Sequence, residues 1–298
     1  MPSQASWEKA GRTQPRIVVL ASVNRPRVKA ELDGIVHILS KSAEIVAVDQ
    51  DESFRFTSTN ELDMCVVLGG DGSILSAARR MGLHQLPVIG VNLGSLGFLA
   101  ALGEKELSRV WPEICEGKFP IDEHVMLACT IIRKSNPSQS ESGYQLALNE
   151  ASILGGAPFS MIQIDLYVDG ELASTYSCDG LIISTPVGST AHNLSAGGPI
   201  LARWLQAVVI SPISPHTLTM RPVVDRADRC YEMYVRHGHA SVSAVFDGRV
   251  LGNLDEGDCY RVTKAPVSFK MINIPGKGEY RTLREKLGWG GNPRENRK

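Results

Sequence analysis

The sequence predicts an α/β domain built on a parallel sheet, followed by a second domain that is rich in β-strands. Up to about residue 120, short apolar runs alternate with helical periodicity, which is typical of a parallel sheet covered by helices on both faces. Beyond residue 120, strand patterns follow one another with little helical periodicity. One apolar run of the first part, 64–68, ends in a glycine turn that leads directly into a helical pattern, as a buried parallel strand and its crossover helix would.

The elements of the first part follow from these patterns. Residues 1–14 are polar and without periodicity, so we expect a disordered lead-in. Branched apolar runs predict strands at 16–21, 44–49, 64–68 and 86–91. Apolar residues at helical spacing predict helices at 28–40, 74–81 and 104–116. Gly82 stands where a helix commonly ends in a left-handed glycine, and Gly117 ends the third helix.

The second part is expected to be antiparallel. Strands are predicted at 124–133, 144–154, 161–168, 172–176, 181–184, 207–210, 230–235, 241–246, 259–262 and 267–274. Asp169-Gly170 predicts a two-residue hairpin turn, and 136–143 predicts a longer hairpin loop. The basic amphipathic segment 278–288 is expected to form a helix that packs back on the first domain. We therefore expect an α/β domain at 15–120 together with 276–290, and a β-rich domain at 121–275.

Composition excludes several classes of protein. The chain has 298 residues and a formal net charge of −1, so charge gives no reason to expect nucleic acid or an anionic membrane as a partner. No apolar run reaches the length that spans a bilayer, and the N-terminus lacks a signal-peptide pattern. The six cysteines lie far apart, which indicates reduced, mostly buried thiols of a cytoplasmic protein.

The turn after 64–68 reads Gly69-Gly70-Asp71-Gly72. Three glycines let the backbone pass close to a bulky anion, and the start of the next helix points free N–H groups toward it. A carboxylate would repel phosphates, so Asp71 is explained there if it holds a metal or takes a proton. The same residues also make an ordinary turn with a helix cap. The pattern is neither a Walker A loop nor Gly-x-Gly-x-x-Gly.

Three further stretches carry polar groups. Residues 178–199 run from a strand into a turn rich in hydroxyls and glycine, which suits a polar nucleotide but also an ordinary capped loop. Asn149-Glu150 interrupts an apolar strand. An Asn amide reads an adenine edge and a carboxylate accepts ribose hydroxyls, although a strand end or bulge explains the pair as well. Asp247-Gly248 is typical of a hairpin turn. His237 and His239 have no third metal ligand nearby in the sequence.

These stretches occur in the order found in NAD kinases, which the chain resembles from about residue 16 to Trp289. Gly-Gly-Asp-Gly alone is shared with phosphofructokinases and with diacylglycerol and sphingosine kinases, whereas the 178–199 block is specific to NAD kinases. The matching segments are Gly69-Gly70-Asp71-Gly72, Asn92-Leu93-Gly94 with Leu96-Gly97-Phe98-Leu99, Asn149-Glu150, Asp179-Gly180 through Gly198-Pro199, Ser214-Pro215-His216-Thr217-Leu218 and Asp247-Gly248.

The resemblance implies an enzyme. NAD kinases transfer the terminal phosphoryl group of ATP, or in some members of inorganic polyphosphate, to the 2′-hydroxyl of the adenosine ribose of NAD, which gives NADP. They require Mg²⁺ or a similar ion, and they assemble as homodimers or homotetramers. Their N-terminal α/β domain is of the kind shared with diacylglycerol kinases and phosphofructokinases, and the site lies between the two domains.

The resemblance also implies residue roles. Asp71 is the expected base for the 2′-hydroxyl proton, and Gly69, Gly70 and Gly72 keep the loop open to phosphates. Asn149 is expected to contact adenine and Glu150 a ribose. The remaining predicted substrate-site residues are Asp179, Thr190, Ala191, His192, Ser195 and, at the phosphate or metal end, Asp247. His192 stands where the family usually has tyrosine. Because an imidazole changes charge near neutral pH, we expect the apparent affinity for NAD to depend on pH.

Other functions compete with this interpretation. A lipid kinase of the diacylglycerol or sphingosine type shares the glycine turn, but it does not explain the 178–199 block. A phosphofructokinase-like sugar kinase has the same difficulty. A non-catalytic NAD(P) sensor would keep the fold without the chemistry, yet a pure binder gains nothing from a carboxylate beside phosphates.

Overall fold

The fold was analysed in a computed structural model that describes residues 11–22, 25–94, 97–100, 102–135, 143–157, 161–236, 241–274, 276 and 279–289. The chain forms two compact units. The first unit contains the residues up to Glu123 and those from Lys270 onward, and the second unit is His124–Phe269.

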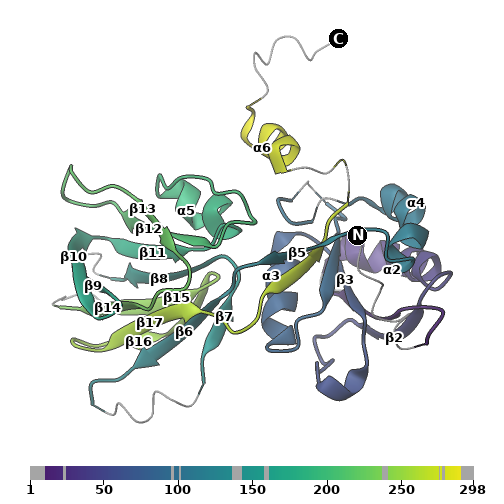
Figure 1. Cartoon of the computed structure of the whole chain (residues 1–298), viewed down its shortest axis with the longest axis horizontal. Helices are drawn as coiled ribbons and strands as arrows, with labels where there is room; N and C mark the ends of the chain where they lie inside the picture. The colour runs from purple at the N-terminus through teal and green to yellow at the C-terminus, as the bar shows by residue number, and fades with distance from the viewer. Residues whose placement is uncertain are drawn as a thin grey trace. The chain divides into compact units, whose positions relative to one another are not determined.

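The first unit is built on a six-stranded sheet with the order β2-β1-β3-β4-β18-β5 (Figure 1). Neighbouring strands from β2 to β18 pair in parallel. The order changes direction at β1, which has β2 on one side and β3 on the other. Open α/β sheets bind ligands at such a switch point, outside the carboxyl ends of the strands. The strands are β1 (Arg16–Ala21), β2 (Glu44–Asp49), β3 (Met64–Leu68), β4 (Pro87–Val91), β5 (Ile121–His124) and β18 (Phe269–Ile272).

Helices cover both faces of this sheet. The helical elements are α2 (Pro26–Leu39), α3 (Asp71–Met81), α4 (Glu104–Cys115), α6 (Glu279–Leu287) and the 3₁₀ turn η1 (Ser58–Asn60). On one face, Ile17 shares a core with Leu32 of α2 and Trp111 of α4, and the Trp111 indole donates to the Leu39 carbonyl at 3.0 Å. On the other face, a Cβ built on Gly90 of β4 would lie 2.6 Å from Ile74 of α3. Glycine at position 90 therefore lets α3 pack closely on the sheet.

The second unit consists of two six-stranded sheets that stack on each other in Figure 1. Their orders are β10-β9-β14-β17-β6-β7 and β13-β12-β11-β8-β15-β16. Ile164 and Met233 of the first of these sheets share one core with Ile153 and Ile183 of the second. The elements are β6 (Leu127–Ile132), β7 (Gln145–Ala147), β8 (Glu150–Gly155), β9 (Ile162–Val168), β10 (Glu171–Cys178), β11 (Gly180–Ser184), η3 (Gly188–Thr190), α5 (His192–Ser195), β12 (Ala207–Ile213), β13 (Val223–Arg226), β14 (Tyr231–Val235), β15 (Val242–Phe246), β16 (Arg249–Leu254) and β17 (Cys259–Lys264).

The predicted fold class is confirmed, and three strands have the predicted bounds: β1, β2 and β3. Asp169 and Gly170 form the predicted turn, with φ of 52° and 83°. Strands β5, β13 and β16 are absent from the prediction because few of their residues are buried, so no apolar alternation marks them. The predicted strand 144–154 is interrupted between β7 and β8.

The end of the chain returns to the first unit. The predicted strand 267–274 contains β18, which pairs in parallel with β4, so it belongs to the sheet of the first unit. Helix α6 is part of that unit as well. Its Leu283 is buried, and the Lys286 ammonium lies 5.6 Å from the centre of the Phe98 ring. Residues 1–10 of the predicted lead-in, 136–142 of the predicted hairpin loop, and both His237 and His239 lie outside the described residues.

The cysteines behave as the sequence predicts. All six are free thiols, and five of them are buried. Within the described ranges, no helix has the length and apolar character needed to cross a membrane.

Candidate active site

The glycine turn lies beside a hollow at the switch point of the parallel sheet. The carboxyl ends of β1 and β3 and the first turns of α3 line the hollow, whose volume is about 100 Å³. Helix α3 begins at Asp71, directly after Gly70. A helix N-terminus carries partial positive charge and unpaired N–H groups, so this end of α3 favours an anion. Gly69 has φ of 141°, a conformation that residues other than glycine rarely adopt.

The carboxylate of Asp71 is held by three consecutive backbone amides. Phe98 donates to Oδ2 at 2.7 Å, while Leu99 and Ala100 donate to Oδ1 at 2.9 and 3.1 Å. Each carboxylate oxygen has two lone pairs, so the two contacts to Oδ1 use its capacity. Among the described residues, Phe98 is the donor to Oδ2. That oxygen therefore keeps one acceptor position for a further proton.

Gly97 is required by this arrangement. A Cβ built on Gly97 would overlap Asp71 Oδ1 and lie 2.9 Å from Asp71 Cγ, closer than unbonded carbon atoms approach. The close contact explains why a glycine precedes Phe98. It also shows that the segment after β4 and the start of α3 are fitted to each other.

A second carboxylate holds amides in the same way in the other unit. Asp247 Oδ2 accepts from the Leu148 amide at 2.8 Å, and Asp247 Oδ1 accepts from the amides of Asn149 and Glu150 at 2.7 and 3.1 Å. Asp247 and Gly248 form the turn between β15 and β16, with φ of 43° and 73°. Asp247 thus fixes the backbone that carries Asn149 and Glu150, while its predicted contact with phosphate or metal stays a prediction.

Glu150 is a buried acidic residue of the second unit. Only 6% of the residue is exposed, and among the described residues its Oε2 atom has no hydrogen-bond partner. Burial, and secondarily the negative charge of Asp247, raise the pKa of Glu150 to about 8. A buried carboxyl atom without a partner is costly, so a ligand hydroxyl that bound it would remove that cost.

The 178–199 block is tied to Asn149 through its backbone. The Thr185 amide donates to the Asn149 carbonyl at 2.8 Å, and the Thr185 hydroxyl donates to the Leu148 carbonyl at 2.6 Å. A Cβ built on Gly188 would lie 2.7 Å from Asn149 Cα. The start of η3 therefore rests directly on Asn149.

The buried side-chain amide of Asn193 holds the rest of the 178–199 block together by hydrogen bonds. Its Nδ2 donates to the carbonyls of Ser189 and Pro199 at 3.1 and 3.0 Å, and its Oδ1 accepts from the Ser211 hydroxyl at 2.7 Å. These bonds connect both ends of the segment to β12. Asn193 and Thr185 were not among the predicted site residues. Their signal in the sequence is only that both lie inside the polar block, which does not distinguish a ligand contact from an internal one.

The predicted residues fall into separate groups. Asp71 and the three glycines lie together in the first unit. In the second unit, Asn149, Glu150 and Asp247 lie together. The half-buried Thr190, Ala191 and His192 run from the end of η3 into α5, and Ser195 is exposed at the end of α5. Asp179 is not in this group. It precedes β11, whose Ser184 pairs with Glu150, so it lies roughly 17 Å away along the strand.

Two family models match most of the chain. The ATP-NAD kinase N-terminal domain matches residues 17–119, and the ATP-NAD kinase C-terminal domain matches residues 148–274. The NAD kinase of Rhodopirellula baltica is 53% identical over 285 residues, which cover 96% of this chain and 90% of that protein. This chain belongs to the NAD kinase family. The NAD kinase of Syntrophotalea carbinolica is 36% identical over 255 residues, which cover 86% of this chain and 88% of that protein.

Solved structures share the fold of this NAD kinase family member. A crystal structure of yeast NADH kinase complexed with NADH superposes with a TM-score of 0.80 at 22% identity, covering 94% of this chain and 89% of that one. The crystal structure of an NAD kinase from Archaeoglobus fulgidus in complex with ATP gives 0.71 at 24% identity, covering 92% and 97%. At these identities the likeness concerns the fold. The matches give no support to the lipid kinase or sensor alternatives.

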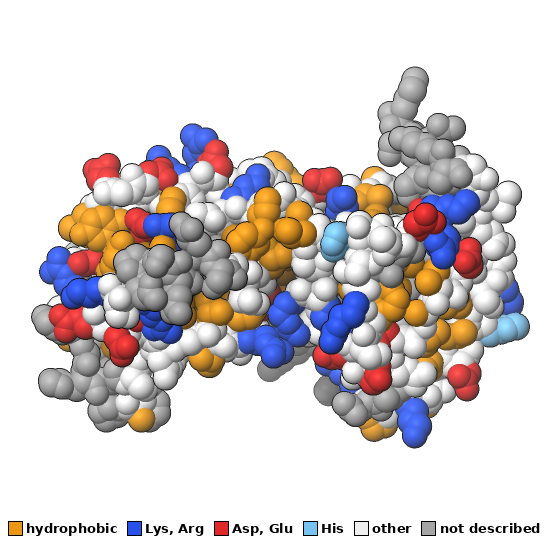
Figure 2. All heavy atoms as spheres, turned by 90° about the horizontal axis from the view of Figure 1, so that it is seen from below, with side chains coloured by type: hydrophobic (Ala, Val, Ile, Leu, Met, Phe, Trp, Pro, Cys, Tyr) orange, Lys and Arg blue, Asp and Glu red, His pale blue; other side chains and the backbone are white. Residues whose placement is uncertain are grey.

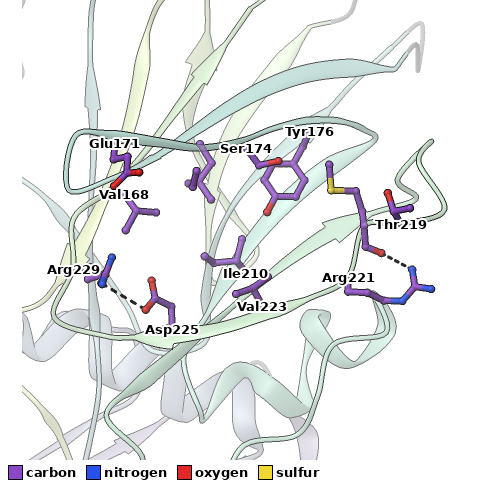
Figure 3. A pocket seen from close by; sticks show the side chains of 13 residues that line it. Val168, Glu171, Ser174, Tyr176, Ile210, Thr219, Arg221, Val223, Asp225 and Arg229 are labelled. Carbon is purple, nitrogen blue, oxygen red and sulfur yellow. Dashed lines mark hydrogen bonds and ion pairs between the residues drawn. The ribbon is translucent and has the colours of Figure 1, made fainter.

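A larger hollow in the second unit is separate from the predicted NAD kinase residues. It has a volume of about 570 Å³ and lies between β9, β10, β12 and the segment leading into β13. Figure 3 shows Tyr176 and Ile210 facing it, with the Arg229–Asp225 ion pair at one side. None of the predicted site residues lines this hollow, so its size does not point to them.

Proposed function

We propose that this NAD kinase transfers the terminal phosphoryl group of ATP to the 2′-hydroxyl of the adenosine ribose of NAD, which yields NADP and ADP. The family membership supports this reaction. The observation that carries the catalytic assignment is the Asp71 carboxylate, which is held by three amides beside a glycine turn and keeps one acceptor position on Oδ2.

In the proposed reaction, Asp71 acts as the general base. A bond forms between the 2′-oxygen of NAD and the terminal phosphorus, and the bond from that phosphorus to the bridging oxygen breaks. The electron pair of the broken bond leaves with ADP, and the proton of the 2′-hydroxyl moves to Asp71. Phosphoryl transfer has a loose transition state, so positioning and charge stabilisation dominate its catalysis. General base catalysis then contributes about 10²–10⁴-fold.

Binding of the dinucleotide is assigned to the second unit. The Asn149 amide suits the adenine edge, because an amide offers both a donor and an acceptor. Glu150 suits ribose hydroxyls, and its buried Oε2 without a partner among the described residues supports that role. Thr190, Ala191, His192 and Ser195 continue the proposed NAD surface beside Asn149. Asp179 remains a proposed NAD contact, and Asp247 a proposed contact at the phosphate or metal end.

A divalent ion, Mg²⁺ in our proposal, fits the residues present. No group of three or more His, Cys, Asp or Glu side chains that could hold an ion occurs within the described ranges. Mg²⁺ usually binds through substrate phosphates and one or two carboxylates, and it does not need such a group. Because the one open acceptor position of Asp71 is assigned to the 2′-hydroxyl, the ion would be held through the donor phosphates. When bound, the ion would neutralise charge on the donor phosphates.

Further parts of the proposal concern donor, assembly and compartment. We assign ATP as the donor, with inorganic polyphosphate as the alternative. We also assign a homodimer or homotetramer. Figure 2 shows apolar side chains on the surface of the second unit. The exposed large apolar residues of this unit include Trp204, Leu218, Val223 and Val224, and exposed apolar surface suits burial against another copy. The free thiols favour a reducing compartment, for which we propose the cytoplasm.

The reaction is tested by measuring NADP formation from NAD and Mg²⁺ with either ATP or polyphosphate. NADP formation with ATP is the expected result, and the ratio of rates with the two donors identifies the preferred one. Stabilisation of the fold by NAD without any turnover would favour the sensor. Stabilisation by lipid head groups and not by NAD would favour a lipid kinase.

A further inference from the structure

Arg25 lies against the glycine turn at the switch point. It follows β1 and is the residue directly before α2. A Cβ built on Gly69 would lie 3.1 Å from Arg25 Nη1, and one built on Gly70 would lie 3.9 Å from the same atom. A Cβ on Gly72 would lie 4.0 Å from Nη2. The guanidinium group therefore faces all three glycines, and Arg25 lines the hollow together with Gly72.

The other arginine of this hollow is already used by the fold. Arg80 forms an ion pair with the buried carboxylate of Asp49 and donates to the Phe54 carbonyl at 3.1 Å. Its guanidinium carbon also lies 6.0 Å from the centre of the Phe56 ring. Arg80 thus links α3 to β2 and to the segment that follows β2. Its charge is largely cancelled by Asp49.

Arg25 is exposed, and among the described residues it makes no ion pair or side-chain hydrogen bond. Two acidic residues line the same hollow, Asp49 and Glu52. Asp49 is paired with Arg80, and Glu52 is exposed at the rim. The hollow therefore contains one arginine whose fork of N–H groups is available to a ligand.

Local structure does not account for an arginine at this position. Position 25 is the N-cap of α2, where Ser, Thr, Asp and Asn are favoured because their side chains accept an amide hydrogen bond. Arg25 makes no such bond, and a cation at a helix N-terminus opposes the helix dipole. A residue that breaks a local rule in this way is expected at a functional site.

We propose that Arg25 binds the phosphate chain of the phosphoryl donor over the glycine turn; this assignment rests on the proposed reaction. The planar guanidinium is always charged and presents parallel N–H groups, which match two phosphate oxygens. The glycines leave room for the phosphates beside the guanidinium group. The N-terminus of α3 adds positive electrostatic potential at the same place. Asp71 receives the proton of the acceptor hydroxyl, while Arg25 stabilises negative charge on the donor.

The test compares Arg25→Asn with Lys29→Gln. Asn is a good N-cap, so R25N is expected to keep or raise the melting temperature. Loss of a charge-assisted hydrogen bond of about 1.5–3 kcal/mol predicts a drop of about 10–150-fold in kcat/KM for ATP. The KM for NAD is expected to stay within about twofold. Lys29 is an exposed cation in the first turns of α2, and K29Q should change neither constant. Arg25→Lys should retain part of the ATP affinity, because it keeps the charge and loses the fork.

Calorimetric binding of ATP separates this assignment from the proposed reaction. Weaker ATP binding by R25N than by K29Q supports the role of Arg25, whether or not the wild-type chain forms NADP. If the wild-type chain forms no NADP, only the proposed reaction is refuted. Equal ATP affinity and equal ATP kinetics in R25N and K29Q would overturn the role of Arg25. A rise in the KM for NAD with unchanged kinetics for ATP would likewise contradict a donor site at Arg25.

Discussion

The amide of Phe98 donates to Asp71 Oδ2 at 2.7 Å, so the proposed base is fixed by the segment that follows the neighbouring strand. With the amides of Leu99 and Ala100 on Oδ1, the carboxylate has one orientation. Asp247 holds the amides of Leu148, Asn149 and Glu150 in the second unit by the same device. In each unit a carboxylate thus positions the backbone of the proposed site.

Gly97→Ala is predicted to impair catalysis, because the added methyl group would overlap the carboxylate of Asp71. The three amides prevent Asp71 from simply turning aside, so the base and the 97–100 segment must shift together. A misplacement of about 1 Å costs up to about 100-fold in kcat. Steady-state kinetics would show this as a fall in kcat with little change in the KM for NAD. The matched control is Gly94→Ala, where the new Cβ would lie 3.7 Å from Asn92 Oδ1; equal kcat in the two variants would refute the prediction.

Asp247→Asn is predicted to weaken NAD binding without abolishing turnover. The substitution replaces one carboxylate oxygen by an NH₂ group, which cannot accept a hydrogen bond from a backbone amide. The backbone of Asn149 and Glu150 is then held less firmly. A disrupted hydrogen bond of about 1–3 kcal/mol corresponds to an increase of about 5–150-fold in the KM for NAD.

A hairpin in the other sheet of the second unit provides the control for Asp247→Asn. Asp169 also occupies an Asp-Gly turn with positive φ, and its Oδ1 accepts from the Cys230 amide at 2.9 Å. Asp169→Asn should therefore lower stability through a similar change but leave the KM for NAD near that of the wild type. If both variants raised that KM equally, the positioning role of Asp247 would be wrong.

Glu150 is predicted to make the stability of the fold depend on pH. Its pKa is about 8 in the folded chain and 4.5 in the reference state. Between these values the folded chain keeps a proton that the unfolded chain has released. The stabilisation is therefore complete below about pH 4.5 and is lost as pH rises through 8, with an upper limit of about 5 kcal/mol.

The measurement is the free energy of unfolding by urea between pH 5 and 9. The wild-type chain should lose stability with increasing pH over this interval, and Glu150→Gln should flatten the profile whatever its absolute stability. Identical slopes in the two proteins would show that Glu150 does not hold a proton in the folded state.

The sequence predicts most strongly where local pattern and tertiary role coincide. Strands β1, β2 and β3 have their predicted bounds because continuous branched apolar runs are bounded by polar or glycine residues. The strand-turn-helix around Asp71 is likewise specified by a short stretch. By contrast, β13 and β16 are edge strands with few buried residues, so no apolar run or alternation indicates them.

The internal supports of the site could not be predicted from the sequence. Asp247-Gly248 has the composition of a plain turn. Only the fold shows that the Asp247 carboxylate accepts a hydrogen bond from the Asn149 amide, 98 residues away in sequence. Thr185 and Asn193 are similar cases, since a polar side chain in a polar loop gives no sign that its partners are backbone groups of the same block. The placement of β18 next to β4 depends on a chain return that no local pattern encodes.

The most direct measurement is the rate of NADP formation by wild-type chain and Asp71→Asn with NAD, ATP and Mg²⁺ at saturation. Asn cannot take the 2′-hydroxyl proton, yet it is close to Asp in size. The account predicts a fall in kcat of about 10²–10⁴-fold with NAD affinity little changed. Turnover by Asp71→Asn close to that of the wild type would contradict the assignment of Asp71 as the base.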